Sequence, residues 1–215
     1  MRYSGCVPRP IIILALMLCC LRLSAQENIR RVDFKNFTYP VSGHLLGHSS
    51  LQWLDGSTAH ADSKPIQLLD GTNLTKTSSF VMDGKEYAQY EGFTFESVHY
   101  ADLTGDGNDE AIVDLSYRSG GTQTTDYVYV YTLDQHRPKL LAYCHTGSRS
   151  DSGLYSVYGQ EGLLVFELLD PSRSQGDCCS SGVLMTRYKW QSGVFKRIGS
   201  SGRRTIPLPQ EKPIK

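Results

Sequence analysis

Apolar and polar residues alternate with a period of two along most of this chain, and that period predicts β-strands. In segment 111–117 the odd-numbered residues are apolar or aromatic, whereas Asp114 and Ser116 fall on the other face. In segment 126–133 tyrosine alternates with valine. Further segments with strand character are 32–39, 79–90, 93–101, 139–144, 154–158, 163–169, 183–190 and 194–198.

Turn residues separate these segments at short intervals. Asp83-Gly84 is a strong two-residue hairpin signal, because both residues tolerate positive φ. Residues 159–162 are a second hairpin candidate, and short helical turns are expected at 43–48 and 64–70. Short connections favour antiparallel neighbours. We therefore expect a mostly β, single-domain antiparallel meander, arranged as a sandwich or a partly open barrel with few short helices.

Residues 1–25 have the three parts of a secretory signal peptide. Arg2 and Arg9 give a basic start, residues 11–21 form an apolar run, and Ala25 is a small residue at a suitable cleavage point. A membrane helix needs about 20 apolar residues, and this run is too short. We therefore expect a secreted or periplasmic protein that is cleaved after Ala25 and has no transmembrane segment in its mature chain.

The mature chain is expected to consist of a β-rich domain at residues 26–199 and a flexible tail at 200–215, which contains three prolines. The whole chain has 215 residues, of which 22 are basic and 22 acidic. Because residues 1–25 contain three arginines and no acid, the mature chain has a net charge of −3. Nucleic-acid binders normally carry a basic surplus, so nucleic acid is disfavoured as a partner.

Three cysteines remain after cleavage, namely Cys144, Cys178 and Cys179. Exported proteins fold under oxidising conditions, so we expect one disulfide that links Cys144 to Cys178 or Cys179, with one thiol left over. A ring between the two adjacent cysteines is strained and less favoured. The sequence contains no CxxC pair, which leaves a zinc site of that kind without support.

One segment between two predicted strands has the composition of a cation-binding loop. Its alternate residues are Asp102, Thr104, Asp106, Asn108 and Glu110, of which Asn108 would contribute its backbone carbonyl. Calcium takes six to eight oxygen ligands, and such a loop could supply several of them. The competing interpretation is an Asp/Gly-rich turn whose carboxylates accept backbone N–H groups. The uncharged third position, Thr104, favours the turn slightly.

Residues 102–113, DLTGDGNDEAIV, resemble the calcium-binding loop of FG-GAP/VCBS-type repeats in integrin-like propellers and secreted bacterial proteins. The resemblance implies acidic ligands and one carbonyl ligand at four positions: Asp102, Asp106, Asn108 and Glu110. Thr104 stands where that family usually has Asp or Asn, which implies weak calcium binding. The chain contains one copy of the loop, whereas a propeller has several, so the implied role of calcium is to brace this loop.

A broader resemblance rests on the order of three segments. They are the acidic loop, a tyrosine-rich hairpin, and the sequence DCCSSG at 177–182 followed by RYKWQSGVF at 187–195. This order resembles that of small uncharacterised secreted bacterial proteins and of LppP/LprE-type lipoproteins. These families bring no established reaction with them, and they imply export and a compact β-rich domain.

Tyr127, Tyr129 and Tyr131 share one face of a predicted strand and form a candidate binding face. Aromatic faces stack on sugars or on protein partners. The ordinary role of tyrosine in a strand, however, is to fill a half-buried sheet face. Both roles are compatible with the sequence, and the ordinary role is the more common one.

No catalytic motif is recognisable in this sequence, and the GxSxG nucleophile elbow is absent. We therefore expect a non-catalytic binding or interaction module whose partner is an unidentified protein or carbohydrate ligand. Weakly bound calcium is the one candidate cofactor. The alternative is a secreted hydrolase whose catalytic residues come from dispersed loops.

Overall fold

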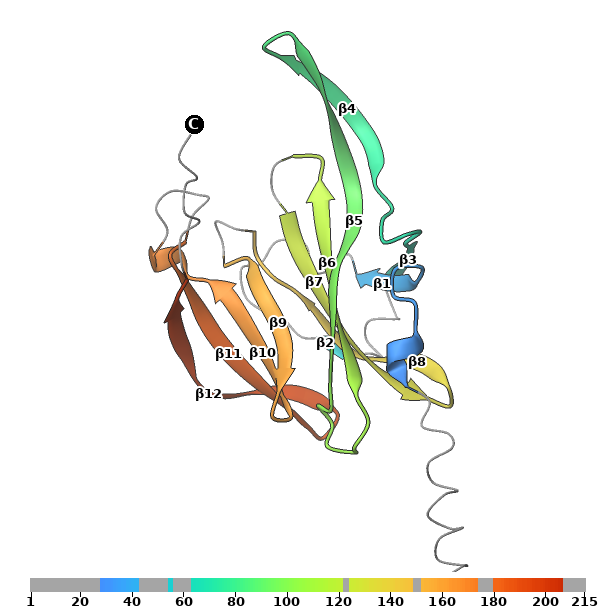
Figure 1. Cartoon of the computed structure of the whole chain (residues 1–215), viewed down its shortest axis with the longest axis vertical. Coiled ribbons are helices and arrows are strands. Elements are labelled where there is room, and N and C mark those ends of the chain that lie inside the picture. Colours follow the sequence, from blue (N-terminus) through green and yellow to red (C-terminus); the bar gives the residue numbers. More distant parts are fainter. Residues whose placement is uncertain are drawn as a thin grey trace, which may run out of the picture.

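The computed structural model describes residues 28–42, 54–55, 63–121, 124–148, 152–173 and 180–206. Strands dominate these ranges, and the helical elements within them are short 3-10 turns (Figure 1). The 3-10 turns are η1 (Ile29–Arg31) and η3 (Pro171–Arg173). The strands are β1 (Thr38–Ser42), β2 (Leu54–Asp55), β3 (Ser63–Gln67), β4 (Thr75–Met82), β5 (Lys85–Ala101), β6 (Glu110–Ser119), β7 (Thr124–Asp134), β8 (Arg137–His145), β9 (Leu154–Gln160), β10 (Leu163–Leu169), β11 (Gly182–Gln191) and β12 (Val194–Thr205).

The described strands form three antiparallel sheets, none of which closes into a barrel. The largest sheet has six strands in the order β2-β8-β7-β6-β5-β4, so β4 to β8 form a continuous meander. A second meander forms the four-stranded sheet β12-β11-β10-β9, and β1 pairs with β3. The expected mostly β, single-domain antiparallel fold is therefore confirmed.

Tight turns explain why strands adjacent in the sequence are adjacent in the sheets. Both turn residues have positive φ in four of the hairpins: Asp83 and Gly84, Gln135 and His136, Glu161 and Gly162, and Ser192 and Gly193. Turns of this kind match the right-handed twist of the strands that they join. The hairpin predicted at Asp83-Gly84 is confirmed, and β4 and β5 are its strands.

The two faces of the six-stranded sheet bury different cores. One face carries Val113 and Leu115 of β6, and it is covered by the N-terminal segment that contains Phe34. The other face carries Ile112, and it packs against the four-stranded sheet through residues such as Phe166. Because side chains alternate along each strand, the sheet contributes to two hydrophobic layers, and neither face is fully solvated.

Gly159 of β9 is a point of close approach between the four-stranded sheet and the larger sheet. A Cβ at this position would overlap the Cβ of Ala101 and would touch Ile112. Only glycine leaves room for this approach, so Gly159 sets how closely the two sheets can pack.

Two expectations for the N-terminal part of the domain are wrong. Segment 32–39, expected as a strand, contains a turn at residues 34–36, because the carboxylate of Asp33 accepts the N–H groups of Lys35 and Asn36. Segment 64–70, expected to hold a helical turn, is mostly β3, which pairs with β1.

The C-terminal boundary also differs from the expectation. Residues 200–205, expected in a flexible tail, belong to β12 and continue its pairing with β11 up to Thr205. A register shift near Met185 and Arg187 absorbs the small residues at 199–202. Segment 43–48, residues 1–25, which were expected to be a signal peptide, and residues 207–215 lie outside the described residues. No helix in the part of the chain that the structure describes has the length and apolar character to span a membrane.

Candidate functional site

The β5–β6 loop uses its carboxylates to hold its own backbone. Asp102 accepts the N–H of Gly105 at 2.7 Å through Oδ1 and the N–H of Gly107 at 3.0 Å through Oδ2. Both glycines have positive φ, which allows their N–H groups to turn towards one side chain. Asp106 accepts the N–H of Asn108 at 2.8 Å in the same manner. The loop is thus closed by short-range hydrogen bonds from side chain to backbone.

Glu110 is fully buried at the start of β6. Its Oε2 accepts the N–H groups of Leu103 and Thr104 at 2.8 and 3.1 Å, and its Oε1 accepts the hydroxyl of Thr132 at 3.1 Å. Burial raises the pKa of Glu110, and these hydrogen bonds offset part of that effect. The side chain therefore joins the loop to the neighbouring strand β7 at the start of β6.

Asp102, Asp106 and Glu110, three of the five predicted calcium ligands, thus already accept backbone N–H groups. Within the described ranges, no three His, Cys, Asp or Glu side chains are grouped so that they could hold a metal ion. These contacts match the interpretation of the segment as an Asp/Gly-rich turn. Calcium binding by Asp102, Thr104, Asp106, Asn108 and Glu110 stays a prediction, and it would require some carboxylate oxygens to exchange N–H donors for the cation.

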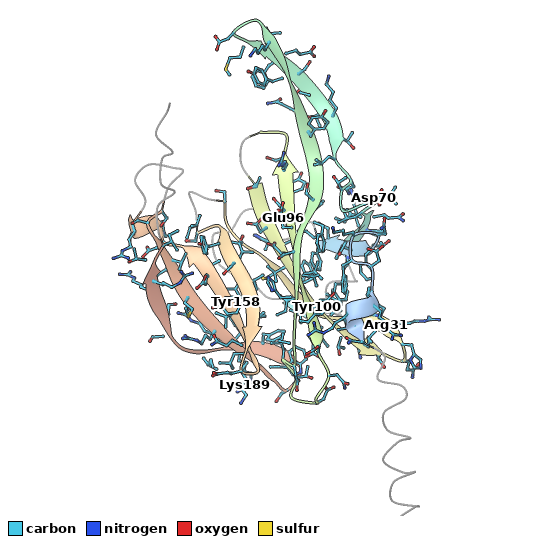
Figure 2. The ribbon with its side chains drawn as sticks, viewed as in Figure 1. Arg31, Asp70, Glu96, Tyr100, Tyr158 and Lys189 are labelled. Carbon is cyan, nitrogen blue, oxygen red and sulfur yellow. The ribbon has the colours of Figure 1, made fainter. Side chains whose placement is uncertain are left out.

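Arg30 connects this loop to the N-terminal turn η1. Its guanidinium lies 2.9 Å from Oδ2 of Asp109 and 4.7 Å from the ring centroid of Tyr100, which is labelled on β5 in Figure 2. Both charged side chains are partly exposed, and ion pairs of this kind contribute little to stability. We infer that the contact positions the loop more than it stabilises the fold.

The tyrosines expected to form a binding face are buried. Tyr127, Tyr129 and Tyr131 do share one face of β7, as predicted, but they are at most 3% exposed. The hydroxyl of Tyr129 donates to the carbonyl of Pro40 at 3.0 Å, which places the N-terminal segment over this face. The expectation of an available binding face is therefore wrong, because η1, β1 and the residues around Phe34 cover it.

The thiol of Cys144 is buried and free in the structure. Burial raises its pKa well above the ordinary value, and the nearby carboxyl of Asp114 adds to the effect. Cys178 and Cys179 lie outside the described residues. The expected disulfide from Cys144 is thus not formed here, and the oxidised pairing stays a prediction.

Asp114 is a buried acid of β6 next to the inter-sheet core, and no motif in the sequence points to it. Its Oδ1 is buried and has no hydrogen-bond partner. Burial raises its pKa to about 8, and the carboxylates of Asp126 and Glu96 add to the rise. Asp114 is therefore mostly protonated at neutral pH. The alternating pattern of β6 could not reveal this state, because it does not tell a solvated polar face from one covered by a second sheet.

The β4–β5 ribbon is a second feature that sequence analysis did not single out. Pairing of β5 with β6 begins at Glu91, so residues 85–90 pair with β4 alone. Every residue of β4 is exposed, and β4 ends the order of its sheet. Figure 1 shows this hairpin extending well beyond the rest of the sheet.

Apolar side chains occupy both faces of the ribbon. On one face, Phe80 stacks on Tyr87 with ring centroids 5.5 Å apart. Val81, on the opposite face, is 71% exposed, and Met82 and Tyr90 are also exposed. A two-stranded ribbon is marginally stable in water when nothing covers either face. The consecutive residues Phe80, Val81 and Met82 break the alternation expected for a half-buried strand, and that break was the available sequence signal.

Comparisons with protein-family models, curated proteins and solved structures give no match for this chain.

Proposed function

We propose that this protein is a non-catalytic interaction module whose contact surface for a protein partner is the β4–β5 ribbon. The observation that carries the proposal is the exposure of Phe80, Val81, Met82 and Tyr87 on a hairpin that leaves the body of the sheet. Large exposed apolar groups on a projecting element are typical of interaction sites.

The backbone of the ribbon supports the same proposal. The outer edge of β4 has no strand paired to it among the described residues, and its eight residues lack proline. An open edge of this kind can accept an added strand, with backbone hydrogen bonds supplying affinity and alternate side chains supplying specificity. Lys76 is the one charged residue of β4, and a lysine on an edge strand hinders unspecific pairing.

Site-specific photocrosslinking in the native cell tests this proposal. A photoreactive phenylalanine analogue at position 80 should yield a discrete protein adduct. The same analogue at Val194, which is also exposed but lies on the other sheet, should not yield it. Val81→Lys should reduce the adduct without lowering the melting temperature, because Val81 makes few contacts. The proposal fails if positions 80 and 194 give the same adducts, or if neither gives any.

We further propose that the protein is exported and acts outside the cytoplasm. The basic start, the short apolar run and Ala25 support this localisation. N-terminal sequencing of the protein recovered from the periplasm or the medium should begin at or near Gln26. Recovery of intact protein beginning at Met1 in that fraction would reject the proposal.

A further inference from the structure

The four-stranded sheet has a charge pattern that neither the loop nor the ribbon explains. Its strands contain one acidic residue, Glu167, and six basic residues, all on β11 and β12. The basic residues are Arg187, Lys189, Lys196, Arg197, Arg203 and Arg204. Residues 26–179, by contrast, carry 21 acidic and 11 basic residues. The β11–β12 hairpin is thus a positive region in a chain that is otherwise negative.

Besides Arg204, which pairs with Glu167 there, three of these cations share the outer face of the sheet, which is the face turned away from the six-stranded sheet. Tyr188 of β11 and Phe195 of β12 pack into the core between the sheets. Because side chains alternate along a strand, Arg187, Lys189 and Lys196 point to the outer face. Figure 2 labels Lys189 near the lower end of β11.

Lys189 and Lys196 are direct cross-strand partners, and both are exposed. Directly opposed side chains have Cβ atoms about 5 Å apart, so two ammonium groups at such positions repel each other. Neither lysine pairs with a described carboxylate. The carboxylate of Glu167, the acid of this sheet, already binds Arg204 and Ser156. An anionic partner would remove the repulsion.

Apolar and aromatic side chains lie beside the cations. Tyr158, Val165, Arg187 and Ile198 form one cross-strand row over all four strands, next to the row that contains Lys189; Val165 is fully buried within it, and the other three are partly exposed. The long stems of lysine and arginine add to this apolar surface. Such a mixture of basic and apolar groups on an extended sheet face suits a planar interface in which phosphates lie above hydrocarbon.

We propose that the outer face of β11–β12 binds the surface of an anionic phospholipid membrane, with Arg187, Lys189 and Lys196 facing the lipid phosphates. Each basic residue close to such a surface adds to the affinity, and the attraction falls off within a Debye length. The acidic remainder of the chain is repelled by the same surface. The charge asymmetry therefore fixes which face of the protein approaches the membrane.

Co-sedimentation of the mature chain with lipid vesicles tests this proposal. We expect binding to vesicles of phosphatidylcholine mixed with phosphatidylglycerol, little binding to phosphatidylcholine alone, and loss of binding at high salt. Lys189→Gln/Lys196→Gln should weaken binding at least about tenfold. The matched control, Lys64→Gln/Lys139→Gln, removes two exposed lysines from other strands and should bind within about twofold of the wild type.

Several outcomes would overturn the proposal. Equal binding to both kinds of vesicle would remove the role of lipid charge, and equal weakening in both double variants would remove the role of this face. Retention on immobilised heparin without any binding to vesicles would assign the face to a soluble polyanion. Circular dichroism of each variant confirms that a loss of binding is not a loss of folding. The ribbon proposal is independent of these results, because the two surfaces lie on different sheets.

Discussion

Arg204 of β12 and Glu167 of β10 form a two-point ion pair across the intervening strand β11. Nε and Nη2 of Arg204 donate to Oε1 and Oε2 of Glu167 at 3.1 and 2.6 Å. The carboxylate is almost completely buried, whereas the guanidinium is about half exposed. This pair lies in the part of β12 that continues beyond the register shift, where residues 202–205 also pair with β11.

We expect Arg204→Ala to lower the free energy of unfolding by about 1–3 kcal/mol, because it leaves a buried carboxylate with fewer donors. Burial acts to raise the pKa of Glu167, but the hydrogen bonds from Arg204 and Ser156 outweigh it and hold the pKa below its ordinary value. The stability from the pair is therefore present above the unfolded pKa of Glu, about 4.3, and is lost as the pH falls through the lowered folded value.

Urea denaturation at pH 7 and at pH 3 measures this effect. The difference between wild type and Arg204→Ala should be largest at pH 7 and should shrink at pH 3. In Glu167→Gln/Arg204→Ala the loss should be smaller than the sum of the losses in Glu167→Gln and Arg204→Ala, because the two residues interact directly. A difference that is the same at both pH values would contradict the ion-pair account.

Asp114→Asn should change how stability depends on pH. Burial, reinforced by Asp126 and Glu96, raises the folded pKa of Asp114 to about 8, whereas the unfolded value is about 4. The stability associated with protonated Asp114 is therefore complete below pH 4 and is lost as the pH rises towards 8. The loss is about 1.4 kcal/mol per pH unit between these two values.

Denaturation midpoints at pH 6 and pH 9 test the role of Asp114. We expect the wild type to lose stability between them and Asp114→Asn to lose much less, so that the variant is the more stable protein at pH 9. Asp109→Asn is the matched control, because Asp109 is partly exposed and directly precedes β6 in the sequence. Parallel pH profiles for wild type and Asp114→Asn would show that Asp114 ionises normally.

Sequence patterns were sufficient to predict the strands for which the turn residues and the alternation of side chains indicate the same element. Asp83-Gly84 fixed one hairpin, and the alternation of β7 correctly placed Tyr127, Tyr129 and Tyr131 on one face. The same alternation could not say which faces are covered, since burial depends on segments distant in the sequence. The N-terminal residues around Phe34 cover the tyrosines, and the four-stranded sheet covers the face that holds Asp114.

The candidate site was predictable to a similar extent. The pattern Asp102 to Glu110 located a loop between two strands, and it included the interpretation that the carboxylates of the loop accept backbone N–H groups. It did not indicate that Glu110 is buried and bonded to Thr132, because β7 is remote in the sequence. The exposed apolar residues of the ribbon went unnoticed for the opposite reason. Apolar residues are ordinarily assigned to a core, and no local feature of the sequence shows that the hairpin extends beyond its sheet.

Glu110→Ala should destabilise the protein by about 2–4 kcal/mol, because the N–H groups of Leu103 and Thr104 and the hydroxyl of Thr132 lose a charged acceptor in the interior. Thr132→Val removes one donor of this set and should cost about 1 kcal/mol. Chemical denaturation of both variants provides the comparison. If Glu110→Ala is no worse than Thr132→Val, the backbone hydrogen bonds of Glu110 contribute little to the stability of the loop.

We expect calcium to bind weakly to the loop, and we expect this binding to depend on Asp106. Asp106 is the exposed acid of the loop, and its carboxylate accepts one N–H, so it can turn towards a cation at small cost. Asp102 and Glu110 must give up part of their N–H bonding to become ligands, and Thr104 adds no charge. Both features lower affinity towards the roughly 10⁻⁴–10⁻³ M range of extracellular calcium modules.

At ten times the Kd, mass action stabilises the folded state by about 1.4 kcal/mol. We therefore expect millimolar calcium to raise the melting temperature of the wild type by a few degrees and to leave Asp106→Ala unchanged, with magnesium as the control cation. Equal responses of the two proteins, or no response from either, would identify the loop as a purely structural turn.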